Sequence, residues 1–122
     1  MMKHEKSWGW EHWFANNSKY CGKLLFVRKG EWSSGGKYHF HKIKDETFLV
    51  IAGGLILDYV EDGVFKSKNM ESYESFRIPV GMKHRFSAYS NEGCKFIEAS
   101  TTHMEEDSYR VLWDEENERW VE

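Results

Sequence analysis

Two histidines, His39 and His41, are separated by a single residue and could bind the same atom. On a β-strand, side chains at positions i and i+2 point to the same face, so both imidazoles can reach one point. Glu46 follows five residues after His41, past a polar turn, at the head of the next expected strand. His84 comes after residues 79–83, where proline fixes φ and glycine permits a chain reversal. We therefore expect these four side chains to meet inside one barrel.

Three imidazoles and one carboxylate form a ligand set of intermediate softness. Such a set suits Fe²⁺, Mn²⁺, Ni²⁺, Co²⁺ or Zn²⁺ better than Ca²⁺ or Mg²⁺. In a six-coordinate ion, four protein ligands leave two positions for water or substrate, where the ion can polarise a carbonyl or activate a water molecule. A single His in a strand is more often a packing or surface residue, and one His-x-His pair can arise by chance among six histidines. The prediction of one divalent transition metal therefore depends on the joint pattern.

Short β-type runs alternate with turn signals along most of the chain, and these elements must position the site. The Asp62-Gly63 pair between two apolar runs predicts a β-hairpin. Eight or so short strands at this spacing favour an antiparallel sandwich or barrel. Residues 115–121 are expected to form a short helix or a tail. The strands are predicted over residues 23–28, 37–41, 46–52, 55–60, 64–66, 74–78, 84–90 and 95–100.

The length of 122 residues predicts a single domain over residues 1–122. Apolar residues make up 40% of the chain, which is enough for a packed core. The net charge of −3 is spread along the sequence, unlike the basic surface of a nucleic-acid binder. No apolar run has the length of a signal peptide or of a membrane span, so we expect no membrane partner and a cytoplasmic protein. In that reducing compartment, Cys21 and Cys94 are expected to be free thiols, with a disulfide as the alternative.

The joint pattern resembles the two motifs of the cupin superfamily. Residues 36–53 contain His-x-His, a four-residue gap, Glu46, a six-residue gap and a glycine, and residues 79–84 read Pro-Val-Gly-Met-Lys-His. Two positions depart from the pattern, because Ser33 stands where a glycine is expected and Ala88 where an asparagine is expected. The resemblance covers residues 24–100. It implies an all-β, single-domain cupin, which is a double-stranded β-helix or jelly-roll barrel, with its core at about residues 23–100 and a metal on the four named ligands.

Two flanking segments extend the likeness to the cupin domain of type II mannose-6-phosphate isomerases. Residues 6–10 read Lys-Ser-Trp-Gly-Trp, with Ser7 in place of the usual proline, and residues 105–110 read Glu-Glu-Asp-Ser-Tyr-Arg. The resemblance implies aldose–ketose isomerisation of a sugar or sugar phosphate, with the metal holding the substrate oxygens while a base moves a proton between two carbons. It also implies a homodimer, since cupins often pair through sheet edges.

Three further residues are candidates for that chemistry. Glu98 on the last strand is a candidate base, although the alternation of the strand leaves an outward-facing carboxylate open. Arg110 could clamp a phosphate or carboxylate with its planar fork, or could form a surface salt bridge with Glu106 or Asp107. His103 could line the mouth of the site or could simply be solvated.

Two other classes of function fit the same motifs, because fold-level likeness does not fix chemistry. An Fe²⁺ dioxygenase could use the three-His, one-carboxylate set. A non-enzymatic binding protein or sensor could use the metal or a bound sugar only to stabilise the fold. Several tryptophans could stack on a sugar or, as large aromatics usually do, seal the barrel or a subunit contact; they are Trp8, Trp10, Trp13 and Trp32.

Overall fold

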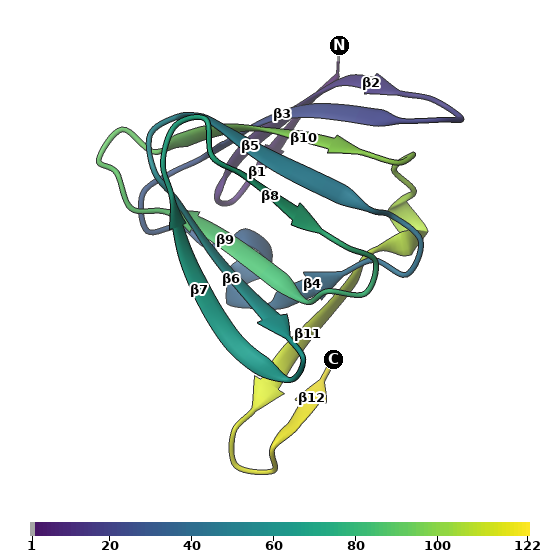
Figure 1. The fold of residues 1–122 in the computed structure, drawn as a ribbon, viewed down its shortest axis with the longest axis vertical. Helices are drawn as coiled ribbons and strands as arrows, with labels where there is room; N and C mark the ends of the chain where they lie inside the picture. The colour runs from purple at the N-terminus through teal and green to yellow at the C-terminus, as the bar shows by residue number, and fades with distance from the viewer. Residues whose placement is uncertain (1) are drawn as a thin grey trace.

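The computed structural model describes residues 2–122, and over that range the chain is built almost entirely of β-strands (Figure 1). Two short 3₁₀ turns interrupt them, η1 (Ser33–Gly36) and η2 (Glu105–Asp107). The strands are β1 (Met2–Lys6), β2 (Gly9–Asn16), β3 (Cys21–Val27), β4 (Tyr38–Phe40), β5 (Glu46–Ala52), β6 (Leu55–Glu61), β7 (Val64–Met70), β8 (Ser75–Ile78), β9 (His84–Ala88), β10 (Cys94–Ser100), β11 (Tyr109–Asp114) and β12 (Arg119–Val121).

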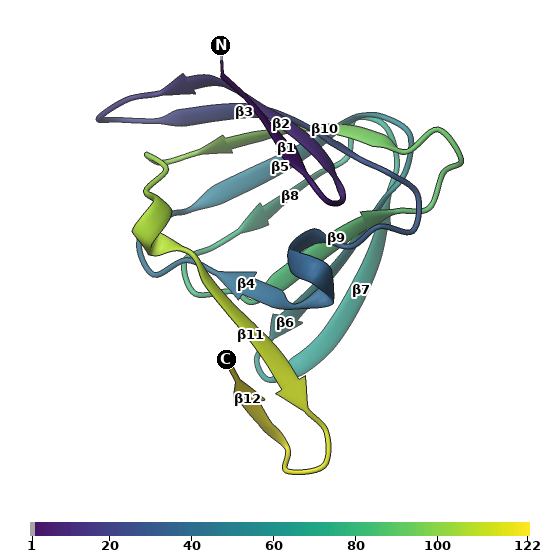
Figure 2. The same cartoon turned by 180° about the vertical axis from the view of Figure 1, so that it is seen from behind.

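These strands form two antiparallel six-stranded sheets that face each other across the core (Figures 1 and 2). The first sheet has the order β1-β2-β3-β10-β5-β8 and the second has the order β12-β11-β4-β9-β6-β7. The chain crosses from one sheet to the other several times, so each sheet contains strands that are distant in sequence. This arrangement is the predicted jelly-roll barrel, and the all-β fold class is confirmed.

The space between the sheets is filled by inward-facing side chains that alternate with outward-facing ones along each strand. In β5, for example, Phe48 and Val50 are buried whereas Leu49 between them is partly exposed. The buried aromatic rings contact one another edge to face, as Phe86 and Phe96 do at 5.1 Å between ring centroids. The core consists of Trp8, Leu25, Val27, Phe48, Val50, Leu55, Leu57, Met70, Ile78, Phe86, Ala88, Cys94 and Phe96.

At one end of the barrel, four strands place a polar residue on the same inward face as these apolar side chains. In β10, for example, Glu98 follows Phe96 on the buried face. We call this set the polar layer; it comprises Lys23 of β3, Glu46 of β5, His84 of β9 and Glu98 of β10, with exposed fractions of 3%, 2%, 0% and 4%. The end of the barrel that would otherwise be closed by apolar packing is therefore lined with groups that need polar or charged partners.

The N-terminal segment forms two strands that were not predicted, β1 and β2. They extend the first sheet beyond β3, with Trp10 of β2 paired to Phe26 of β3. The alternation in β2 is hidden because Glu11, which is 9% exposed, faces inward while Phe14 is 52% exposed. A buried acid and an exposed aromatic invert the pattern on which strand prediction depends.

Of the two alternatives expected for residues 115–121, the short helix was wrong, because the segment forms a turn followed by strand β12. β12 pairs with β11 as a hairpin that extends from the body of the barrel (Figure 1). Trp113 and Trp120 lie directly opposite each other, with ring centroids 5.1 Å apart, and such cross-strand aromatic pairs stabilise hairpins. Glu118 has a φ of 50°, which is a turn conformation and not a helical one.

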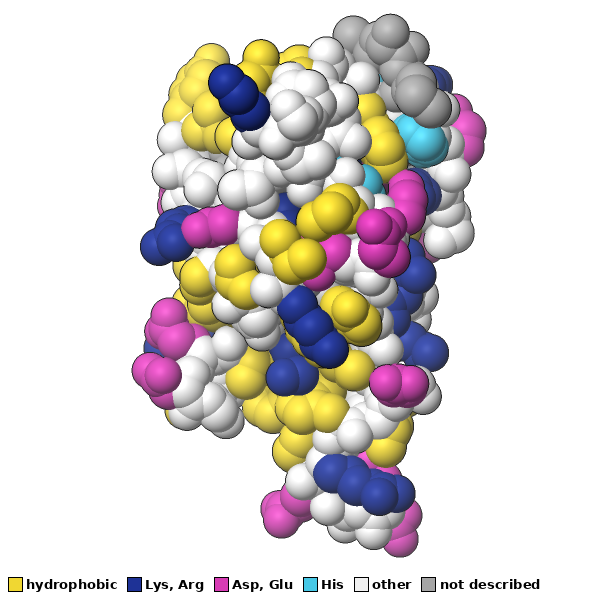
Figure 3. Space-filling view, turned by 90° about the vertical axis from the view of Figure 1, so that its right-hand side faces the viewer, with side chains coloured by type: hydrophobic (Ala, Val, Ile, Leu, Met, Phe, Trp, Pro, Cys, Tyr) yellow, Lys and Arg dark blue, Asp and Glu magenta, His cyan; other side chains and the backbone are white. Residues whose placement is uncertain are grey.

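Two further expectations, the β-hairpin at residues 62–63 and the free cysteines, are confirmed. Asp62 and Gly63 both have positive φ, of 52° and 75°, in the turn between β6 and β7. Cys21 and Cys94 are buried free thiols. Over the described residues, no helix is long and apolar enough to cross a membrane. Figure 3 shows Lys and Arg side chains, Asp and Glu side chains and apolar side chains side by side on the face that it presents.

Gly53 and Gly63 offer a matched test of how tightly the strand connections are packed. Both have positive φ, but a Cβ at Gly53 would lie 2.0 Å from the carbonyl oxygen of Gly93, whereas a Cβ at Gly63 meets nothing within 4 Å. We expect G63A to lower the free energy of unfolding by about 1–2 kcal/mol through the left-handed backbone alone. G53A should cost a further 1–3 kcal/mol, roughly, from the steric overlap. Urea denaturation measures both; equal losses would contradict the packing described here.

Candidate metal centre and its cavity

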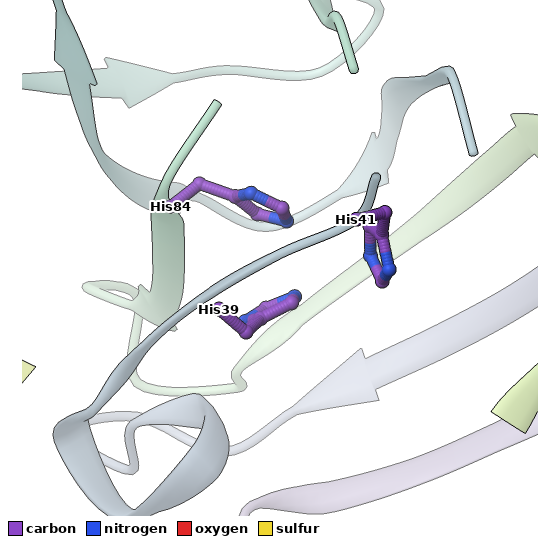
Figure 4. Close-up of side chains that lie close together, drawn as sticks. All are labelled: His39, His41 and His84. Atoms are coloured by element: carbon purple, nitrogen blue, oxygen red, sulfur yellow. The ribbon is translucent and has the colours of Figure 1, made fainter. Parts of the chain in front are cut away.

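Three imidazoles converge at the polar end of the barrel, and one ligand atom from each lies within 4.8 Å of the other two (Figure 4). His39 belongs to β4, His41 follows that strand directly, and His84 begins β9. His39 and His84 are directly opposite each other in the ladder between β4 and β9, which accounts for their approach from distant parts of the sequence. The predicted turn after Pro79 is confirmed, because Met82 N–H donates to the Pro79 carbonyl.

Backbone carbonyls fix the orientation of two of these rings. The Nδ1–H of His41 donates to the carbonyl of Asp107 at 2.6 Å, and the Nδ1–H of His84 donates to the carbonyl of Met82 at 2.9 Å. Because a carbonyl can only accept a hydrogen bond, each ring carries its proton on Nδ1 and presents the lone pair of Nε2 to the site. This is the usual arrangement around metal-binding histidines.

Glu46 brings a carboxylate to the same point. Its Oε2 lies 3.0 Å from His41 Nε2 and 3.8 Å from His84 Nε2. Glu46 Oε2, His84 Nε2 and His39 Nδ1 are buried without a hydrogen-bond partner in the described structure. The carboxylate oxygen and the imidazole nitrogen that holds no proton are electron-pair donors, so they need a cation or a proton rather than another acceptor.

The protonation states of the histidines suit a metal. Burial, followed by the neighbouring His84 and His41, lowers the pKa of His39 well below its usual value. Burial also lowers the pKa of His84, although Glu46 acts in the opposite direction. Neutral imidazoles and an ionised carboxylate are the forms that bind a metal, so the residues present fit a divalent transition metal.

Asp107 holds the turn that joins His41 to Glu46, and sequence reasoning had not assigned it this role. Its carboxylate accepts hydrogen bonds from the backbone N–H groups of Lys42, Ile43 and Lys44, at 2.8 Å, 3.2 Å and 2.9 Å. Burial alone would raise the pKa of Asp107, but these three donors lower it. The carbonyl of the same residue orients the His41 ring, so one residue of the C-terminal segment fixes both the ring and the turn.

His39, His41 and Glu46 line a cavity of about 470 Å³, which is within the size range of small-molecule sites, and His84 lies buried behind them. Both sheets and the N-terminal strands contribute to its wall, including Trp8 and Trp13. Figure 2 shows the turn between β1 and β2 reaching over the space between the sheets toward η1. The charged residues that line the cavity are Lys6, Glu11, Lys23, Lys37, Lys44, Glu46, Glu98, Glu105 and Arg110.

Glu98 faces this cavity and not the solvent. Its Oε2 accepts hydrogen bonds from Lys44 Nζ at 2.8 Å and from Ser100 Oγ at 3.1 Å, and Lys23 Nζ lies 4.0 Å away. Burial alone would raise the pKa of Glu98, but the charges of Lys44 and Lys23 lower it to about 2. The structure thus places Glu98 in the same cavity as His39, His41 and Glu46, with two buried lysines, Lys23 and Lys44, that the sequence did not indicate. Lys44 occurs among surface-type charges in the sequence, and Lys23 stands at the start of an apolar run, where a lysine usually marks an exposed strand end.

His103 and Arg110 also line the cavity. His103 Nδ1 lies 3.2 Å from Lys23 Nζ and 3.3 Å from Lys44 Nζ; burial and these two cations lower its pKa to about 3, so it is neutral. Arg110 is exposed at the mouth and donates through Nε to Ser34 Oγ at 3.1 Å. Within residues 2–122, Arg110 forms no ion pair with Glu106 or Asp107.

Comparison with known proteins shows the fold. No family model and no curated protein matches this sequence. Solved structures do match: oxalate decarboxylase from Bacillus subtilis (TM-score 0.78, 15% identity), CapF, a capsular polysaccharide assembling protein from Staphylococcus aureus (0.77, 17%), and KdgF from Halomonas sp. (0.71, 12%). The matches cover 89%, 88% and 87% of this chain, and 29%, 31% and 92% of those chains. The chain therefore spans about a third of the length of the first two, and it has the cupin fold.

Replacement of both His39 and His41 by alanine tests the metal centre. We expect the wild-type chain, purified without a chelator or a His tag, to carry about one equivalent of a divalent transition metal. The H39A/H41A variant should carry less than about a tenth of that, because two of four ligands are missing. Elemental analysis measures both. H12A is the control, since the His12 ring packs at a tilt against Trp10 and is not among the residues that line the cavity; full occupancy in the double variant would refute the assignment.

The ionisation of Glu98 tests the electrostatics of the cavity. Its depressed pKa means that its contribution to stability is present above the ordinary carboxylate pKa and is lost as the pH falls toward about 2. We expect the K44M substitution to raise the Glu98 pKa by roughly 1–3 units, because burial then acts against one cation fewer. The ¹³C NMR shift of the Glu98 carboxyl, followed against pH, measures this. K95M is the control, because Lys95 is exposed on the same strand; an unchanged titration in K44M would contradict the ion pair.

Proposed function

We propose that this cupin-fold chain is a metal-dependent enzyme that moves a proton between neighbouring carbons of a small sugar or sugar phosphate, as an aldose–ketose isomerase or epimerase does. One observation supports this most directly. His39 and His41 of the three-histidine cluster, together with Glu46 and a second buried carboxylate, Glu98, line one cavity large enough for a small molecule. A cation that stabilises charge on oxygen, together with a carboxylate that accepts a proton, is the pair that this chemistry needs.

In this proposal, His39, His41, Glu46 and His84 hold the metal, which supplies electrostatic stabilisation for negative charge on the oxygens of the substrate. Asp107 keeps His41 and the following turn in place, and the carbonyl of Met82 does the same for His84. We also propose that the protein acts in the cytoplasm as a homodimer.

Glu98 would take the proton from carbon. Because Lys44 and Lys23 lower its pKa to about 2, Glu98 is ionised at physiological pH but is a weak base. A substrate oxygen that accepts a hydrogen bond from Lys44 would weaken the pair between Lys44 and Glu98 and would raise the proton affinity of Glu98. The base would then become strongest when the substrate is in position. Arg110 and His103 would contact the substrate from the mouth and from the wall of the cavity.

The names of two structural neighbours refer to acidic or carbohydrate molecules. CapF is described as assembling a capsular polysaccharide, and oxalate decarboxylase is named for a small dicarboxylate. Both names refer to oxygen-rich molecules, as the polar wall of the present cavity would require. The likeness between the chains is confined to the fold, so the proposal depends on the cavity residues of this chain.

Hydrogen exchange at the reacting carbon tests the proposed function. We would load the protein separately with Mn²⁺, Fe²⁺, Co²⁺, Ni²⁺ and Zn²⁺, and would incubate it in D₂O with aldoses, ketoses and their phosphates. Proton NMR should show exchange at the carbon next to the carbonyl with at least one metal. E98Q should slow that exchange by about 10²–10⁴-fold, because a positioned base is lost, whereas K95M should not.

Two outcomes would contradict the proposal. Loss of all exchange is expected in H39A/H41A, so exchange that persists at the wild-type rate would remove the metal from the reaction. Oxygen uptake with Fe²⁺ and no proton exchange with any metal would favour the dioxygenase alternative.

A binding protein for the same class of molecule is a second candidate, and one observation favours it. Glu98 is held by Lys44 at 2.8 Å, and a base in a tight ion pair is a poor acceptor unless the pair opens. Calorimetric binding of a sugar without exchange, turnover or oxygen uptake would identify this alternative.

A further inference from the structure

Lys23 and Lys44 are buried cations that the metal centre does not use. Each is only 3% exposed, and both line the cavity. Lys23 lies in β3 and Lys44 in the turn before β5, so they approach the same place from different parts of the first sheet and its connections. A fully buried lysine is rare unless it has a partner that repays the loss of water.

The protein provides fewer acceptors than these two ammonium groups have donors. Each ammonium carries three N–H bonds. Glu98 Oε2 accepts from Lys44 at 2.8 Å but lies 4.0 Å from Lys23. His103 Nδ1 is within 3.3 Å of both nitrogens, but a neutral imidazole has a single lone pair there and can serve only one donor fully. Donors are therefore left over.

Glu11 does not supply the missing acceptor for Lys23. Its Oε1 lies 3.8 Å from Lys23 Nζ, beyond hydrogen-bond distance, and already accepts from Trp13 Nε1 at 2.7 Å. The other side of the Lys23 ammonium faces the Trp13 ring, 4.4 Å from its centroid. Among residues 2–122, no other acceptor lies within hydrogen-bond distance of either ammonium, so the surplus N–H groups of Lys23 and Lys44 are available to a ligand in the cavity.

The rest of the cavity wall also favours a negative ligand. Lys6, Lys37 and Arg110 line it beyond the buried pair, against Glu105 on the same outer part. The acids deeper in the cavity already have cationic partners or face the metal-binding cluster: Glu98 pairs with Lys44, Glu11 lies near Lys23, and Glu46 contacts His41. A bound divalent ion would add positive charge, and an excess of positive charge on a concave wall raises the local concentration of anionic ligands.

We propose that Lys23 and Lys44 bind the anionic oxygens of the substrate, a carboxylate or a phosphate on a small polyhydroxylated molecule, and so select charged sugars over neutral ones. The inference rests on the proposed function, in which the hydroxyl or carbonyl oxygens of the same substrate lie toward the histidines. It also gives Lys44 a second role, because an anion that takes a hydrogen bond from Lys44 competes with Glu98 for it. Lys23 and Lys44 are thus specificity-determining residues, and Lys44 couples binding to the strength of the base.

Isothermal titration calorimetry with three related ligands tests this inference. The Zn²⁺-loaded full chain is titrated with gluconate, glucose 6-phosphate and the neutral polyol glucitol. At least one of the two anions should bind at least about tenfold more tightly than glucitol. Tighter binding of gluconate would indicate a carboxylate site, and tighter binding of glucose 6-phosphate a phosphate site. K23M and K44M should each weaken that anion by about ten- to a hundredfold, the loss of one charge-assisted hydrogen bond, and should leave glucitol unchanged. K95M should match the wild type.

Folding and metal binding are controlled separately. K44M leaves Glu98 without its nearest cation. The double variant K44M/E98Q removes both charges and is measured beside it. Far-UV circular dichroism and thermal unfolding show whether each variant is folded. H39A/H41A should lose the metal and still prefer the anion over glucitol. If proton exchange is never found but anion binding requires Lys23 and Lys44, the proposed reaction fails and the anion site stands. Two results would overturn the inference. The first is an anion affinity that is unchanged in K23M, K44M and K44M/E98Q when these variants are folded. The second is no binding of either anion up to about 10 mM.

Discussion

The burial of charge at one end of the barrel is the constraint on which the rest of this structure depends. The inward face of a jelly-roll strand normally continues as apolar packing, but here the polar layer of Lys23, Glu46, His84 and Glu98 replaces it. A buried charge is tolerated only where partners compensate for lost water, so each member of the layer restricts its neighbours. Lys44 compensates Glu98, and His103 accepts from the lysines. Around Glu46, the lone pairs of His41 and His84 point toward the same carboxylate, an arrangement that a cation stabilises.

The backbone around this layer is fixed by contacts between distant parts of the chain. The ladder between β4 and β9 places His39 beside His84, and Gly81 N–H donates to the His41 carbonyl at 2.8 Å. The C-terminal segment then secures the other side, because Asp107 both orients His41 and accepts from three N–H groups of the next turn. The positions of the histidines and of Glu46 are therefore set largely by main-chain hydrogen bonds, which do not depend on the conformations of flexible side chains. A rigid frame of this kind reduces the reorganisation that binding would otherwise require.

The sequence predicted those parts of the site that depend on local spacing. His39 and His41 share a face because strand side chains alternate, and the turn after Pro79 follows from the conformations of proline and glycine. Lys23, Lys44 and Asp107 were not predicted, because each is buried by contacts with segments more than 50 residues away in sequence, as the bond between Lys44 and Glu98 shows. β2 was missed for a related reason, since its buried Glu11 inverts the expected alternation. Over residues 115–121 acidic helix-type composition was outweighed by the cross-strand contact of Trp113 with Trp120.

The difference between the barrel frame and the few residues of the cavity explains why the fold does not identify the reaction. Proteins as different in name as oxalate decarboxylase, CapF and KdgF share this architecture with the chain at 12–17% identity. What two such barrels have in common is the apolar packing and the strand order, whereas chemistry depends on the few inward positions next to the histidines. In this chain those positions place one carboxylate, Glu98, in the same cavity as His39, His41 and two ammonium groups. Its charge stabilises both lysines, and in the proposed reaction it would become a stronger base when a substrate anion accepts the hydrogen bond from Lys44. The lysines and Glu98 thus form one electrostatic unit, so substrate charge and proton transfer would be coupled through the same bonds.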